Sequence, residues 1–89
     1  MIVYLFVYDS TAHTFVERFW VAGSPAATRC CPPEADLQDR CVQHEDAEAA
    51  ITRLRARYPR PRYAVSRMAA TSWQVVEDNF HGLHYHELE

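Results

Sequence analysis

Lysine is absent from this chain of 89 residues, so all nine basic side chains are arginine. Glycine is also scarce: with only Gly23 and Gly82, the chain has no glycine-rich loop of the kind that binds phosphates in nucleotide-binding proteins. None of the serines lies in the Gly-x-Ser-x-Gly motif of serine hydrolases. Because these common signatures of catalysis are missing, we expect a protein that is not an enzyme and that needs no cofactor.

Cysteine is limited to Cys30, Cys31 and Cys41, an odd number without a Cys-x-x-Cys motif. Adjacent cysteines rarely bridge each other or share one zinc ion, so we expect free thiols in a reducing compartment. The apolar N-terminal run ends at Asp9, too early to cross a membrane, and no basic residue precedes it as in a secretion signal. The sequence therefore predicts a cytoplasmic protein that does not engage a membrane.

The overall composition is that of a small folded domain. Hydrophobic residues make up 48% of the chain, which is enough to form a core, and the length suits a single domain over residues 1–89. The formal net charge is −3. Since an acidic chain is repelled by phosphate backbones, the charge argues against direct binding of nucleic acid.

Two strands and a helix are predicted by their hydrophobic periodicity. Residues 1–8 are apolar on both alternating faces, which is typical of a central strand, and residues 15–22 form its hairpin partner. Strict alternation places Phe15 on the same face as Glu17 and Phe19. Between Glu45 and Tyr58, apolar residues recur at helical spacing, with acids in the first turn and arginines in the last turns.

The remaining segments complete the predicted sheet. Residues 62–69 and 72–78 are expected to be strands, although 72–80 also has helical spacing, and short strands are expected at 40–43 and 83–87. The fold class is therefore α+β, an antiparallel sheet of four to five strands with one helix packed on one face, in the order β-β-(β)-α-β-β.

One helix covers only one face of such a sheet, and the chain is rich in large aromatic residues. We therefore expect part of the second face to be an interface, either with another protein or in a homodimer. The aromatic residues on which this expectation rests are Tyr4, Phe6, Tyr8, Trp20 and Trp73.

Three groups of side chains are candidate sites. An acidic block could bind the basic surface of a partner, and its residues are Asp36, Asp39, Glu45, Asp46 and Glu48. The histidines near the C-terminus could bind Zn, Ni or Cu, and these are His81, His84 and His86. A basic stretch interleaved with tyrosines could bind nucleic acid, and its arginines are Arg53, Arg55, Arg57, Arg60 and Arg62.

Of these alternatives, the sequence favours a non-enzymatic protein-interaction domain. Its acidic or aromatic surface would bind a larger protein complex, as an adaptor or a small inhibitor of a phage or mobile-element type. A nucleic-acid-binding complex would suit the acidic block, because the arginines and lysines of such a complex attract carboxylates. Metal binding or sensing by the histidines and nucleic-acid binding by the arginines remain the two alternatives.

Overall fold

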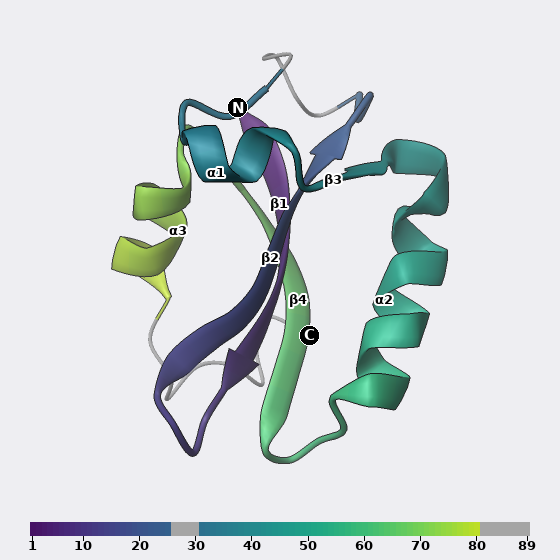
Figure 1. The fold of residues 1–89 in the computed structure, drawn as a ribbon, viewed down its shortest axis with the longest axis vertical. Coiled ribbons are helices and arrows are strands. Elements are labelled where there is room, and N and C mark those ends of the chain that lie inside the picture. Colours follow the sequence, from purple (N-terminus) through teal and green to yellow (C-terminus); the bar gives the residue numbers. More distant parts are fainter. Residues whose placement is uncertain (26–30, 81–89) are drawn as a thin grey trace.

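The computed structural model of the protein describes residues 1–25 and 31–80 (Figure 1). In chain order its elements are β1 (Ile2–Asp9), β2 (Thr14–Ala22), α1 (Ala35–Gln38), β3 (Cys41–Gln43), the 3-10 turn η1 (His44–Asp46), α2 (Ala47–Arg57), β4 (Tyr63–Ala70) and α3 (Trp73–Asn79). The four strands form one sheet in the order β3-β2-β1-β4. β1 is antiparallel to both of its neighbours, whereas β3 is parallel to β2.

The strand β1 is the centre of the fold. It pairs over its whole length with β4 and over most of its length with β2, and nearly all of its residues are buried. Its even-numbered residues, such as Tyr4 and Phe6, join one hydrophobic cluster, and Leu5 and Val7 join another on the opposite face. This confirms the prediction of a central strand with two apolar faces.

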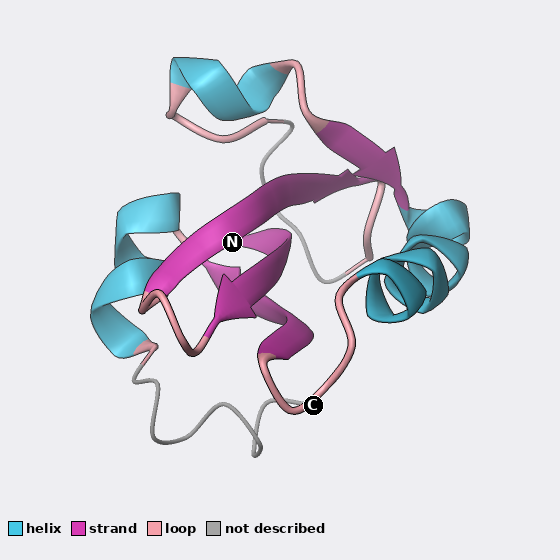
Figure 2. Cartoon of the chain, turned by 60° about the horizontal axis from the view of Figure 1, so that its bottom comes forward, coloured by secondary structure: helices cyan, strands magenta, loops and turns pink. Residues whose placement is uncertain are grey.

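Helices cover both faces of the sheet, and this corrects the predicted architecture. Figure 2 shows the long helix α2 on one side of the strands and the two short helices, α1 and α3, on the other. Ala50 and Ile51 of α2 pack in one cluster, while Leu37 of α1 and Trp73 of α3 pack in the other. The class is α+β as predicted, but the sheet is mixed, because the chain turns through α1 before β3 and therefore returns parallel to β2.

The segment 72–78, predicted as a strand, is instead the helix α3. Ser72 caps it, since its Oγ accepts a hydrogen bond from the backbone N of Val75 at 3.4 Å. Helical spacing buries Trp73, Val76 and Phe80 together against the sheet, whereas a strand would turn some of them outward.

Because α1 and α3 cover the second face, the large aromatic residues from which an interface was predicted belong to the hydrophobic core. The five aromatic residues on which the interface was predicted are each at most 8% exposed. The argument from these residues to an interface is therefore wrong.

Other predicted segments are confirmed with small changes of boundary. The helix expected from Glu45 to Tyr58 is η1 followed by α2, the strand at 40–43 is β3, and the strand at 62–69 is β4. The strand expected at 83–87 lies outside the described residues.

A β-bulge in β2 changes which face one aromatic residue occupies. Tyr8 is paired with Phe15 and Val7 with Glu17, so Val16 is an extra residue in β2. The bulge places Phe15 on the α3 face, where its ring lies 4.9 Å from that of Trp73. Strict alternation, which placed Phe15 beside Glu17, is wrong at this point.

Candidate interaction surface

The outer edge of β2 is half open. β3 covers this edge only from Trp20 to Ala22, and residues 14–19 have no strand partner on this side within the described chain. The backbone N of Trp20 donates to the carbonyl of Arg40 at 3.1 Å. Because backbone direction repeats every two residues, the N–H and C=O of Arg18 face the same outer side. The open half of β2 can therefore accept an added strand.

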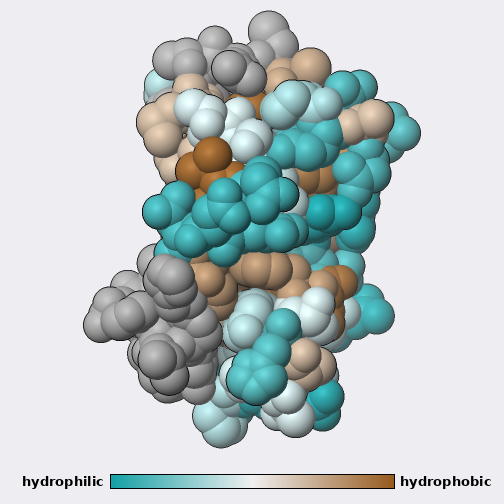
Figure 3. Space-filling model, turned by 90° about the vertical axis from the view of Figure 1, so that its left-hand side faces the viewer, coloured by the Kyte–Doolittle hydropathy of each residue, from teal (hydrophilic) through white to brown (hydrophobic). Residues whose placement is uncertain are grey.

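A hollow of about 470 Å³ lies beside the open half of β2 on the face covered by α3. We call it the α3-side hollow; its lining includes Phe15, Arg18, Trp73, Glu77 and Phe80. Figure 3, which views the molecule from this side, shows hydrophilic and hydrophobic groups interspersed rather than one large hydrophobic patch. Such a surface fits a partner that brings both apolar and polar side chains.

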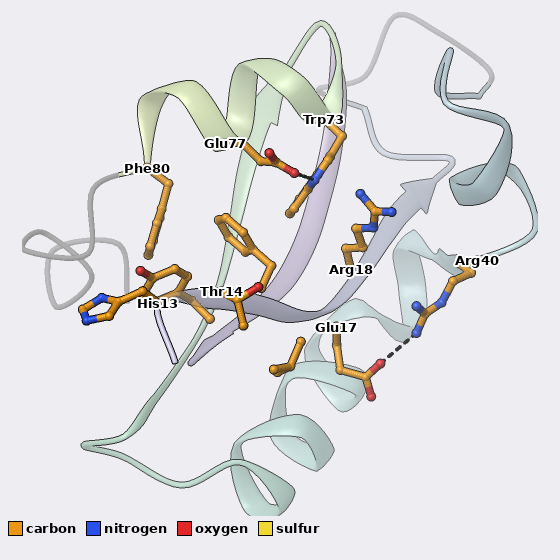
Figure 4. A pocket seen from close by; sticks show the side chains of 11 residues that line it. His13, Thr14, Glu17, Arg18, Arg40, Trp73, Glu77 and Phe80 are labelled. Carbon is orange, nitrogen blue, oxygen red and sulfur yellow. Dashed lines mark hydrogen bonds and ion pairs between the residues drawn. The ribbon is translucent and has the colours of Figure 1, made fainter. Parts of the chain in front are cut away.

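Several polar groups of the α3-side hollow, including Arg18 and the indole of Trp73, have partners within the chain. The guanidinium of Arg18 lies 5.6 Å from the centre of the Trp73 ring and forms an ion pair with Asp36. The indole N–H of Trp73 donates to the carboxylate of Glu77 (Figure 4). The charges here balance, so this hollow provides shape and aromatic surface rather than net charge.

A second hollow, of about 390 Å³, lies on the opposite face between β2 and α2, and we call it the α2-side hollow. Phe19, Ala50 and Leu54 provide its apolar lining. Arg53 and Arg57 also line it, one helical turn apart. The open half of β2 is therefore flanked by a hollow on each face of the sheet.

Glu17 lines both hollows and is held in place by two hydrogen bonds. Arg40 donates to its Oε1 at 2.8 Å, and the hydroxyl of Tyr58 donates to its Oε2 at 3.1 Å. The bond from Arg40 is the main cause that lowers the pKa of Glu17. Burial, and then the bond to Glu17, raises the pKa of Tyr58. Glu17 thus stays ionised and is committed to Arg40 and Tyr58.

The structure distributes the acidic block over both faces of the sheet. Asp36 of α1 pairs with Arg18, and Glu48 of α2 pairs with Arg67 at 2.6 Å. The other three are exposed and have no ion-pair partner within residues 1–25 and 31–80; they are Asp39, Glu45 and Asp46. None of the five lines either hollow beside β2.

The structure also separates the arginines of the basic stretch. Arg55 donates to the carbonyl of Val65 at 3.2 Å on the β4 side of α2. Arg62 donates to Asp9 at the far end of the β1–β2 hairpin, and Arg60 is exposed in the turn before β4. Only Arg53 and Arg57 lie together, in the α2-side hollow.

The predicted histidine site, made of His81, His84 and His86, lies outside the described residues. Within the described part of the chain, no group of three or more histidines, cysteines or acids could hold a metal ion. Cys31 and Cys41 are free and exposed.

Sequence reasoning did not select Val16, Glu17 or Arg18 as site residues. A signal for them was present, because Glu17 and Arg18 are two adjacent charges inside an otherwise apolar strand. A strand buried between two neighbours rarely carries such a pair, so it marks an edge.

Comparison with protein-family models, with curated proteins and with solved structures finds no match to this chain. No helix in the described ranges is long and apolar enough to cross a membrane.

Proposed function

We propose that this chain is a non-enzymatic protein-interaction domain that binds an extended segment of another protein along the open half of β2. The observation that carries the proposal is the open edge with a hollow on each face. A strand added to this edge projects its side chains alternately to the two faces, and thus into both hollows. Its backbone would bond to the outward groups of Arg18, and its side chains would supply specificity.

The residue at the bulge supports this choice of surface. Val16 is 39% exposed, and it and Met1 are the large hydrophobic residues that the described structure leaves exposed. Its position on the open edge is where an added strand would cover it.

A foreign segment suits this edge better than a second copy of β2. In a symmetric antiparallel pair, opposed residues project to the same face, so a two-fold axis at Glu17 or Arg18 would place like charges opposite each other. A segment from a different protein has no such restriction. The charges therefore disfavour a homodimer through β2 in these two registers.

Site-specific photocrosslinking in the cells of origin tests the proposal. A benzophenone amino acid at Val16 should crosslink one discrete partner, and the same amino acid at the exposed Ala49 of α2 should not. Peptide mapping of the adduct should identify a single segment of the partner. Equal adducts from both positions would contradict the proposal.

A backbone variant tests whether the partner adds as a strand. Arg18→Pro removes one outward N–H without removing a bond to β1, so it should abolish the Val16 adduct. Arg18→Ala is the matched control, because it removes the side chain and keeps the N–H. If Arg18→Pro remains folded and crosslinks as well as Arg18→Ala, the added-strand geometry is wrong.

A further inference from the structure

The α2-side hollow combines an apolar lining with two arginines that form no ion pair among the described residues, although the guanidinium of Arg57 lies 5.4 Å from the centre of the Tyr58 ring. Other cations near the sheet have partners: Arg18 with Asp36, Arg40 with Glu17, Arg62 with Asp9, and Arg67 with Glu48. Arg53 and Arg57 have no carboxylate partner among the described residues. The acid that lines the hollow, Glu17, is already bonded to Arg40 and Tyr58, and the charge of Arg57 acts on it more weakly than that of Arg40.

Their positions on α2 turn both arginines toward β2. Arg53 and Arg57 are four residues apart and line the same hollow as Phe19 of β2. Like charges at this spacing repel each other, so the free helix is slightly destabilised and an incoming carboxylate would relieve the repulsion. Arg55, on the same helix, is instead directed to β4 through its bond to Val65.

We propose that the segment that binds the open half of β2 is acidic on the face it turns toward α2. Its carboxylates meet Arg53 and Arg57, and an apolar side chain next to them covers Phe19 and Leu54. This inference rests on the proposed function, and it specifies the chemistry of the partner segment.

The dimensions of a strand and a helix support a pair of acids. Residues two apart on a strand share a face and lie about 6.6 Å apart, and four residues of helix rise about 6 Å. α2 runs alongside the strands of the sheet (Figure 1). Two acids spaced i and i+2 can therefore face Arg53 and Arg57 together.

A peptide fits this site better than a nucleic acid. The outward N–H and C=O groups of Arg18 need the donors and acceptors that a peptide backbone supplies. The net charge of −3 repels a polyanion, and the two arginines form too short a cationic surface to follow a phosphate backbone.

Selection from a library of random ten-residue peptides displayed on phage, with the full chain as bait, tests the inference. The bait is the natural chain, the double variant Arg53→Gln/Arg57→Gln, or the matched control Arg55→Gln. Peptides enriched on the natural chain and on Arg55→Gln should carry Asp or Glu two residues apart, and this preference should vanish on the double variant.

An enriched peptide should bind the natural chain at least about tenfold more tightly than it binds the double variant, by fluorescence anisotropy. Its glutamine version should bind both proteins equally weakly, and added salt should weaken only the acidic version.

The outcomes separate the two proposals. If the enriched peptides lack acids but fail to bind Arg18→Pro, the partner segment is not acidic, and the proposal that it adds as a strand to β2 still stands. No enriched peptide, or peptides that bind Arg18→Pro equally well, would overturn the proposed function itself. If single-stranded DNA binds through Arg53 and Arg57, the site is for nucleic acid and the proposal of an acidic peptide is wrong. If the chain self-associates and Arg18→Pro abolishes the association, the occupant is a second copy of the chain.

Discussion

The carboxylate of Glu34 accepts a hydrogen bond at 2.6 Å from the backbone N of Trp73, which lies 39 residues away in sequence. Trp73 is the first residue of α3, where backbone N–H groups lack partners within the helix. The second oxygen of Glu34 accepts from the hydroxyl of Tyr4 at 3.4 Å. Glu34 therefore connects the start of α1 to α3 and to the central strand.

Replacing Glu34 by alanine should lower the free energy of unfolding by about 1.5–3 kcal/mol, the range for hydrogen bonds to a charged group. Urea denaturation at neutral pH measures the change. Glu45→Ala is the matched control, since Glu45 is exposed, and it should change stability by less than about 0.5 kcal/mol. An equal effect of the two substitutions would show that Glu34 does not cap α3.

The contact of Glu34 also explains why α3 could not be predicted securely from the sequence. Residues 72–78 fit both a strand and a helix by periodicity, and the group that decides between them comes from a distant segment. By contrast, β1 and α2 carry strong periodic patterns of their own, and both were predicted correctly. The parallel pairing of β3 depends on the short helix α1, which was not among the elements predicted from the sequence.

Asp9, the last residue of β1, and Arg62, which directly precedes β4, hold the adjacent ends of these two strands together. Arg62 donates from Nε to Oδ1 at 3.2 Å and from a terminal nitrogen to Oδ2 at 3.1 Å, and Asp9 is buried. These bonds from Arg62 are the main cause that lowers the pKa of Asp9 in the folded state. A lowered folded-state pKa stabilises the protein above the ordinary carboxyl pKa, and this contribution is lost as pH falls through the folded-state value.

The variant Asp9→Asn should therefore be less stable than the natural chain at pH 7, and the difference should shrink as pH falls below about 4. Urea denaturation at pH 7, 5, 4 and 3 measures the difference at each pH. Arg62→Gln should remove most of the same pH dependence, because it removes the main cause of the lowered pKa of Asp9. A difference between Asp9→Asn and the natural chain that stays constant with pH would contradict the assignment.

The ionisation of Tyr58 tests its hydrogen bond to Glu17 of β2. Its pKa is raised by burial and by its bond to Glu17, so it should ionise later than an ordinary tyrosine in a spectrophotometric titration. The difference between the natural chain and Tyr58→Phe isolates this residue. Glu17→Gln should move the ionisation of Tyr58 to lower pH, because the acceptor is then uncharged.

Tyr58 also has a predictable effect on alkaline stability. A raised folded-state pKa stabilises the fold fully below the ordinary tyrosine value near 10, and the contribution is lost as pH rises through the folded-state pKa. An ionisation of Tyr58 that does not respond to Glu17→Gln would show that burial alone shifts its pKa.

The candidate site was only partly visible in the sequence. The position of Arg53 and Arg57 on one flank of α2, with Arg55 on the other, follows from helical spacing alone. Their juxtaposition with Phe19 depends on how α2 packs on the sheet, and the open half of β2 depends on the length of β3. The bulge at Val16 is a local irregularity that strict alternation misses.

The last prediction uses the acidic block to distinguish two possible binding sites on the molecule, the open half of β2 and the acidic residues themselves. If the partner binds along β2, reversing three of the acids together should leave the binding of an acidic peptide unchanged or slightly tighter, since none of them lines either hollow. The variant is Asp39→Arg/Glu45→Arg/Glu48→Arg. It should remain folded, because its one lost ion pair, Glu48 with Arg67, is exposed and contributes about 0–1 kcal/mol.

The same variant should also keep the photocrosslink from Val16 to its cellular partner. Loss of that adduct in a folded protein would move the partner to the acidic surface that the sequence first indicated. Because Arg53→Gln/Arg57→Gln leaves the acidic block intact, the two variants should have opposite outcomes under either hypothesis. Measuring both against one crosslinked partner therefore decides which surface binds it.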